Sequence, residues 1–104
     1  MVVTRLVERT LDVRASWPDG KPVDGADIYM ALEHSKEWDD PTNSSRAGIT
    51  ENGGVATIRL WGDSRVRVIA RFVEDREKPT MARYSTPVEL DPSHLPARLE
   101  LVIR

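Results

Sequence analysis

The chain has 104 residues, and its 15 basic and 17 acidic residues give a formal net charge of −2. Charged residues make up 31% and hydrophobic residues 39%, the composition of one ordinary globular domain over residues 1–104. This excludes a disordered tail, an inserted membrane protein and a strongly basic nucleic-acid binder. Because cysteine is absent, disulfides, thiolate chemistry and cysteine-based metal sites are excluded too.

The amino-terminal segment gives an expectation for location. Its apolar residues are interrupted by Arg5, Glu8 and Arg9, and no small-residue cleavage site follows, so a signal peptide is not expected. No apolar run approaches the length that crosses a bilayer. We expect a cytoplasmic protein if the chain is complete, and an exported or cell-surface one if it is a domain of a longer protein.

Alternating apolar and polar residues predict the first two strands. The odd positions from residue 7 to residue 17 are apolar except Arg9, and the even positions from 26 to 32 are apolar. Tyr29 and Ala31 are therefore expected on the outward face of the second strand. Between the strands, residues 18–25 contain two prolines and two Asp-Gly pairs, which favour tight turns. A helix from Asp27 to Lys36 is the weaker alternative.

Residues 34–45 form the longest predicted loop, because they are polar, contain a proline and show no period. Loops on rigid scaffolds often carry binding function. Beyond this loop, two hairpin turns are predicted, at Asn52-Gly53-Gly54 and at Gly62-Asp63-Ser64. They separate three runs with a period of two, at residues 46–50, 55–60 and 66–72, which we expect to be half-buried strands.

The carboxyl-terminal third predicts two further strands. Residues 82–88 alternate, but Pro87 restricts this strand to an edge or an end of a sheet. Asp91-Pro92-Ser93 begins a turn or a short helical turn, and residues 97–103 alternate again. About seven short strands at this spacing predict an antiparallel β-sandwich with an immunoglobulin-like or transthyretin-like Greek key. The expected core consists of Leu11, Val13, Ala26, Ile28, Met30, Ala56, Ile58, Leu60, Val66, Val68, Ala70, Phe72, Leu99 and Leu101.

Four motifs in order, DGKPV (19–23), GADI (25–28), GITENG (48–53) and VRVIA (66–70), resemble the carboxypeptidase regulatory-like domain family. The resemblance covers roughly residues 11 to 72. It implies a transthyretin-like sandwich of seven strands and the role of a non-catalytic module appended to enzymes, adhesins and surface proteins. A shared fold says much less about function than about architecture.

Two groups of relatives with catalytic or covalent chemistry do not fit. Hydroxyisourate hydrolases resemble residues 11–26 but need a histidine on the first strand and a Tyr-Arg-Gly-Ser carboxyl terminus, and this chain has neither. Pilin-type relatives with isopeptide bonds need an asparagine on the last strand, and residues 97–104 contain none. We therefore predict no enzyme activity, no catalytic residue and no cofactor.

A metal site is not predicted either. His34 and His94 are the only histidines, and each is expected to be exposed. The loop acids Glu37, Asp39 and Asp40 carry oxygen ligands, but their spacing matches no EF-hand loop.

Two tryptophans are candidate ligand residues. Trp38, in the polar loop, either folds back to cap the open end of the sandwich or stands out as a platform for a sugar ring or a partner. Trp61, at the outward parity of its strand, forms an apolar patch with Val55 and Tyr29 or covers the sandwich edge.

Four arginines share the outward parity of two runs predicted to be adjacent: Arg59, Arg65, Arg67 and Arg71. They predict a basic stripe for carboxylate or phosphate partners, or a mixed-charge face neutralised by Asp27 or Glu100.

The leading prediction is an interaction or spacer module that binds a protein partner or a neighbouring domain. The alternative is a carbohydrate-binding module that uses exposed tryptophans. Two coplanar exposed indoles on one surface would favour sugar, whereas an apolar patch on one strand face would favour protein.

Overall fold

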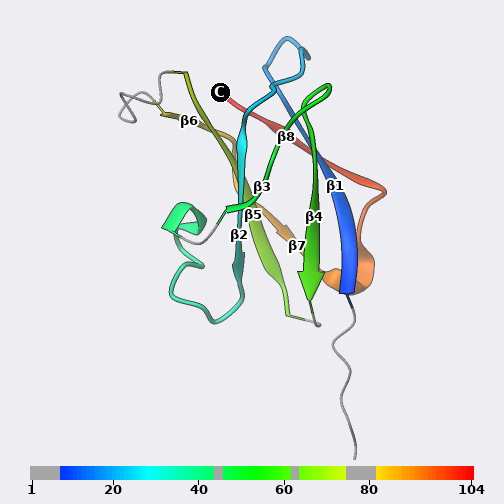
Figure 1. Ribbon diagram of the computed structural model, residues 1–104. Coiled ribbons are helices and arrows are strands. Elements are labelled where there is room, and N and C mark those ends of the chain that lie inside the picture. The colour runs from blue at the N-terminus through cyan, green and yellow to red at the C-terminus, as the bar shows by residue number, and fades with distance from the viewer. Residues whose placement is uncertain (1–7, 44–45, 62–63, 75–81) are drawn as a thin grey trace, which may run out of the picture.

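The computed structural model describes residues 8–43, 46–61, 64–74 and 82–104, and these residues form two β-sheets that face one another (Figure 1). This all-β architecture agrees with the predicted class and is compatible with a sandwich. None of the helical segments in the described ranges is long and apolar enough to cross a membrane. In chain order the elements are β1 (Glu8–Ser16), β2 (Asp27–Leu32), the 3₁₀ turn η1 (Pro41–Asn43), β3 (Arg46–Ile49), β4 (Val55–Trp61), β5 (Val66–Val73), β6 (Ala82–Tyr84), β7 (Val88–Leu90), the 3₁₀ turn η3 (Pro92–His94) and β8 (Arg98–Val102).

The smaller sheet has the order β4-β1-β8, and the larger one has the order β3-β2-β5-β6, with β7 also paired to β5. All pairs are antiparallel except β1 and β8, which run parallel from Asp12 opposite Arg98 to Ser16 opposite Val102. The expectation of a wholly antiparallel sheet is therefore wrong for this pair. Side chains alternate in the same way in parallel and antiparallel pairs, so the sequence pattern does not indicate in which direction two paired strands run.

The two predicted hairpins are not hairpins. The turn at Asn52-Gly53-Gly54 forms with φ angles of 50°, 101° and 78°, but the ladder that it starts has a single bridge, between Glu51 and Val55. After that bridge, β3 joins the five-stranded sheet and β4 joins the three-stranded one. β5 belongs to the sheet opposite β4, so the second connection also crosses between sheets, and Gly62 and Asp63 lie outside the described residues.

The reason for the first crossing lies in how the turn is docked. The amide of Ala15, at the end of β1, donates to the carbonyl of Gly54 at 2.8 Å. This bond places the start of β4 beside the end of β1. β4 then pairs with β1 from Arg14 opposite Val55 to Glu8 opposite Trp61. A tertiary contact therefore overrides the local preference for a hairpin.

The predicted core is confirmed, with additions. All of the expected residues are buried except Met30 and Phe72, which are partly buried and pack against the core. Ala15, Val23, Leu90 and Ile103 also belong to it.

The predicted strand at residues 82–88 is divided. β6 and β7 both pair with β5, and Pro87 lies in the break between them, at the edge of the sheet as expected. The hydroxyl of Ser85, also in the break, accepts a hydrogen bond from the Ala70 amide at 2.9 Å. The short turn predicted after Asp91 is confirmed as η3.

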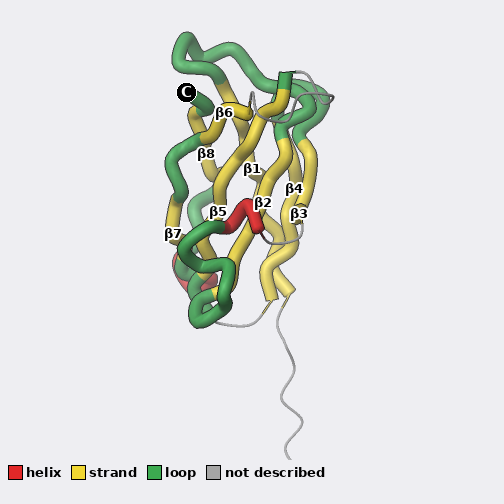
Figure 2. Tube along the Cα trace, turned by 90° about the vertical axis from the view of Figure 1, so that its left-hand side faces the viewer, coloured by secondary structure: helices red, strands yellow, loops and turns green. Residues whose placement is uncertain are grey.

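The outward face of the larger sheet is covered by residues 33–43, which we call the strap. η1, at the end of the strap, contacts both β2 and β5, and Figure 2 shows the strap passing in front of these strands. Tyr29, Ala31 and Ile69 on this face are consequently only 8%, 2% and 7% exposed. Tyr29 and Ala31 thus lie on the outward face, as predicted, but the strap buries them. Alternation does not reveal that a distant loop covers a face.

Candidate functional site

The structure separates the four predicted arginines. Arg59 lies on β4 in the three-stranded sheet, whereas Arg67 and Arg71 lie on β5 in the five-stranded sheet and Arg65 immediately precedes β5. The predicted basic stripe is therefore not formed. The prediction is wrong because it requires β4 and β5 to be neighbours in one sheet, whereas they belong to different sheets.

The predicted patch of Val55, Trp61 and Tyr29 is not formed either. The backbones of Val55 and Trp61 lie on β4, while Tyr29 is buried under the strap on the opposite sheet. The side chain of Trp61 lies outside what the structure describes.

Arg71 and Tyr29 belong to a structural cluster around Asp27, which is only 1% exposed. Asp27 accepts from Arg46 Nη1 at 3.1 Å and from Arg71 Nη2 at 3.3 Å, and the Arg71 guanidinium lies 5.1 Å from the centroid of the Tyr29 ring. Asp27 thus neutralises arginines of this face, as one of the two alternatives predicted. A buried carboxylate is costly to leave without its guanidinium partners, so these groups hold one another in place and leave little for a ligand.

Trp38 has a different environment, in the strap and held by one residue of β5. Arg67 Nη1 donates to the Trp38 carbonyl at 2.8 Å, and the same guanidinium lies over the indole, 5.1 Å from the ring centroid. Arg67 Nη2 also donates to Glu89 Oε1 of β7 at 3.2 Å. Trp38 does not cap the end of the sandwich, because this guanidinium holds it against the outer face of the larger sheet.

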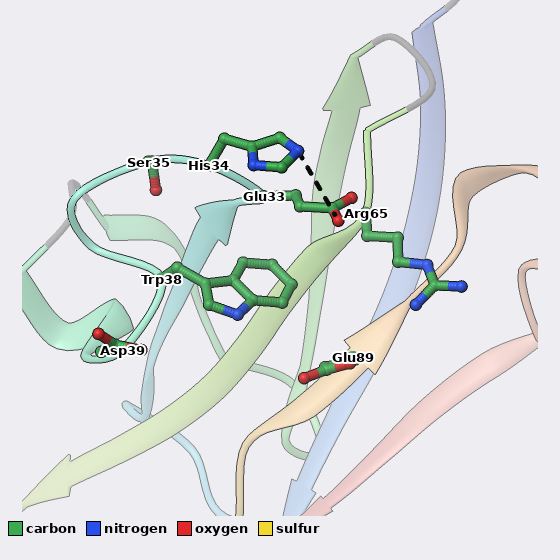
Figure 3. Close-up of a pocket in the computed structure, with 7 residues that line it drawn as sticks. All are labelled: Glu33, His34, Ser35, Trp38, Asp39, Arg65 and Glu89. Atoms are coloured by element: carbon green, nitrogen blue, oxygen red, sulfur yellow. Dashed lines mark ion pairs between the residues drawn. The ribbon is translucent and has the colours of Figure 1, made fainter.

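Around the half-buried Trp38 ring lies an open concavity of about 470 Å³, which we call the Trp38 concavity. In Figure 3 the indole lies between Glu33 and His34 on one side and Asp39 and Glu89 on the other. The lining residues are Glu33, His34, Ser35, Trp38, Asp39, Arg65 and Glu89.

The backbone of this region is fixed at the end of β2. The Glu33 amide donates to the Arg65 carbonyl at 2.8 Å, and the Ser35 amide donates to the Leu32 carbonyl at 3.1 Å. His34, between them, has a φ of 70°, a left-handed conformation that non-glycine residues seldom adopt. The strap thus leaves the sheet through a tight turn, and strained backbone of this kind is often found at ligand sites.

The concavity offers one aromatic surface among charged and hydrogen-bonding groups. Its three carboxylates, on Glu33, Asp39 and Glu89, accept hydrogen bonds, while Arg65 donates. Glu89 is already paired with Arg67, and Glu33 Oε1 lies 3.9 Å from His34 Nε2. An aromatic ring that is surrounded by hydrogen-bond acceptors and a guanidinium group can bind a polar ligand that has one flat apolar face.

The sequence alone does not identify most of this site. It singles out Trp38, Arg65 and Arg67, but it does not connect them with Glu33, Ser35 or Glu89. The one signal available is register, because Arg67 stands directly opposite Glu89. That register depends on the break in the edge strand at Pro87, which alternation does not predict.

A second group of polar residues lies at η3, where Asp91 precedes the turn and Ser93 and His94 belong to it. The Ser93 hydroxyl donates to Asp91 Oδ1 at 2.7 Å and lies 2.9 Å from His94 Nδ1. In a catalytic triad, the imidazole lies between the acid and the nucleophile, and the hydroxyl donates to the imidazole. Here the hydroxyl donates to the acid, and Asp91 also accepts from the Ser93 amide, so the group is a helix cap.

This cap predicts a measurable titration. The Ser93 hydroxyl and amide, with a smaller contribution from the charges of His94 and Arg65, lower the pKa of Asp91 below its ordinary value of 3.8. A lowered pKa means that the ionised carboxyl stabilises the fold above its ordinary pKa, and this contribution is lost as pH falls through the lowered value. We expect Ser93→Ala to raise the pKa of Asp91 towards 3.8, as measured by NMR of the carboxyl carbon. An unchanged titration would contradict the role given to the hydroxyl.

Among residues 8–43, 46–61, 64–74 and 82–104, no three or more His, Cys, Asp or Glu side chains are placed so that they could hold one metal ion. His34 and His94 are both exposed, at 88% and 82% of their side-chain surface. Asp40 caps η1 by accepting from the Thr42 amide at 3.2 Å and from its hydroxyl.

No protein-family model matches the chain, and no solved structure matches it. Among curated proteins, the chain is similar to the peptidoglycan-binding protein YepA of Agrobacterium fabrum, with 33% identity over 82 residues. It is also similar to proteins of Brucella melitensis and Brucella abortus that are provisionally named binding proteins, with 34% identity over 82 residues. Each match covers 79% of this chain and 12% of the relative, so the chain spans about an eighth of the length of these relatives.

Proposed function

We propose that this chain is a non-catalytic binding domain that works as one part of a longer binding protein, and that its ligand site is the Trp38 concavity. The observation that carries the proposal is the way Arg67 joins the strap backbone, the Trp38 ring and Glu89. These three contacts fix an aromatic ring at the surface in a hollow lined by polar groups. A preformed site of this kind binds with a smaller loss of entropy than a mobile one.

A carbohydrate-containing ligand fits the site best. A pyranose ring presents an apolar C–H face that packs on an indole, and its hydroxyl groups donate to carboxylates. The volume of about 470 Å³ accommodates a small ligand of this type. The name of the Agrobacterium relative supports a cell-wall ligand, since peptidoglycan is built from N-acetylated amino sugars joined to short peptides.

A second candidate is a module that docks onto a protein partner or a neighbouring domain. The chain matches only 12% of each relative, and this observation favours the second candidate. The binding activity in the names of those proteins can belong to a part of them that this chain does not match. The resemblance to carboxypeptidase regulatory-like domains, with their transthyretin-like Greek key, supports the same role, because such domains are usually accessory modules.

A titration with soluble peptidoglycan fragments tests the first candidate. We expect the intact domain to bind them, and Trp38→Ala to weaken binding at least about tenfold, because stacking on the ring is lost. The matched control is Tyr84→Ala, which removes an aromatic residue that is 44% exposed on β6 and does not line the concavity. Calorimetry measures the affinity, and a thermal melt of each variant shows whether it folds.

The same experiment separates the two candidates. Binding that Trp38→Ala abolishes and Tyr84→Ala preserves supports the ligand site. If no fragment binds, or if both variants bind as the intact domain does, the Trp38 concavity is not the site. The docking role is then the better account of the domain.

A further inference from the structure

The position of Arg67 bears on which ligands the Trp38 concavity accepts. The guanidinium lies over one face of the indole, 5.1 Å from the ring centroid, so a ligand can use only the other face and the ring edges. The attraction of an aromatic ring for a cation comes from the negative potential above its face. A cation that already occupies one face weakens this potential at the other and repels a second positive charge across the ring.

The charge of Arg67 is well placed to act through the ring. Its side chain is 25% exposed, whereas the Glu89 side chain that pairs with it is 50% exposed. The Arg67 Nε atom is buried and has no hydrogen-bond partner within the described residues. Water therefore screens this cation less than it screens the exposed Asp39, and somewhat less than it screens Glu33, whose side chain is 38% exposed.

We infer that Arg67 makes the Trp38 concavity selective for neutral sugar rings, such as N-acetylated amino sugars, and disfavours rings that carry an ammonium group. This inference rests on the proposed carbohydrate site and adds its specificity. The carboxylates of Glu33, whose side chain is 38% exposed, and of the exposed Asp39 accept hydrogen bonds from hydroxyl and amide groups. Their attraction for an ammonium is weakened by solvent.

Arg67 is on this account a positioning and specificity-determining residue. It aims the ring through its bond to the Trp38 carbonyl, and it sets the potential of the ring through its charge. The two effects can be separated. The orientation of the ring affects the affinity for every ligand, whereas the charge of Arg67 affects the preference between a neutral ligand and a cationic one.

The test compares N-acetylglucosamine with glucosamine, as single sugars or as short β-1,4 oligomers, at a pH where the amine is charged. We expect the intact domain to bind the acetylated sugar about fivefold more tightly or better. In Arg67→Gln/Glu89→Gln the net charge is unchanged, and we expect the ratio of the two affinities to shift about fivefold towards the amine. Arg67→Gln alone should shift it further, because Glu89 is then unpaired.

The matched control is Arg71→Gln, which also removes an arginine from the outer face of β5, where it lies over the Tyr29 ring, but does not line the concavity. It should leave the ratio unchanged. Thermal melts confirm that each variant is folded, and the double variant avoids the unpaired carboxylate that the single variant leaves.

The outcomes for the specificity and for the site itself are distinct. If binding depends on Trp38 but the intact domain binds the amine as well as the acetylated sugar, the inference about Arg67 is wrong and the site remains. A ratio that is the same in the folded double variant also overturns it. If neither sugar nor any larger fragment binds in a Trp38-dependent manner, the proposed site itself is wrong.

Discussion

Replacing Gly54 by alanine is expected to destabilise the protein by about 3 to 5 kcal/mol, a large share of the 5 to 15 kcal/mol typical of a domain. An added Cβ would lie 2.6 Å from the Ala15 carbonyl oxygen and 2.9 Å from the Val23 amide nitrogen, both backbone atoms. The φ of 78° adds strain, because a side chain is disfavoured there. Thermal or denaturant unfolding followed by circular dichroism measures the loss, which corresponds to roughly 15 °C or more in Tm.

The control is the preceding residue. Gly53 has a φ of 101°, yet a Cβ there would meet no atom within 4 Å. Gly53→Ala therefore carries the cost of the backbone conformation alone, about 1 to 3 kcal/mol. If both variants lose the same stability, the close approach to Ala15 is not what requires glycine at position 54.

Thr50→Val is expected to cost about 2 to 4 kcal/mol, although the two side chains have almost the same shape. The Thr50 hydroxyl accepts from the Ala26 amide at 2.9 Å and donates to the Val23 carbonyl, and the residue is only 1% exposed. Valine would leave that amide and that carbonyl buried without this partner, and an unsatisfied buried polar group is costly. Chemical denaturation gives the change in the free energy of unfolding.

Thr57→Val is the matched substitution at the surface. The Thr57 hydroxyl donates to Asp12 Oδ1 at 2.7 Å, but both groups are exposed and water can replace the bond. We expect a change of at most about 0.5 kcal/mol. Equal losses for the two variants would mean that the buried position of Thr50 has no special weight.

Alternation and turn chemistry predict the elements of this fold well, because they reflect local geometry. Leu11 and Val13 of β1, or Leu99 and Leu101 of β8, face the core wherever their strands pair, since the side chains of a strand alternate in any sheet. Pro87 falls at an edge for an equally local reason, because it has no amide hydrogen to donate.

Which strands pair depends on contacts between residues that are distant in the chain, and the sequence pattern does not predict these contacts. The Asn52-Gly53-Gly54 turn forms as predicted, yet β3 and β4 separate because the Ala15 amide binds the Gly54 carbonyl. The four arginines fail to form one stripe for the same reason, since Arg59 follows β4 to the other sheet.

The candidate site shows the same limit. Trp38 is conspicuous in a polar loop, but its surroundings depend on the strap lying across β2 and β5. Tyr29 becomes buried and Arg67 comes to lie against the indole only through that arrangement. The Trp38 concavity is a product of tertiary packing.

The parallel pairing of β1 with β8 has a consequence for how the domain is made. Arg14 and Glu100, which contact each other across this pair, are 86 residues apart in the chain. During synthesis β1 therefore emerges from the ribosome long before β8, and until then the smaller sheet has only two strands, which are marginally stable by themselves. Closing so long a loop is slow. Until β8 pairs, one edge of β1 has no partner, and an unpaired strand edge promotes aggregation.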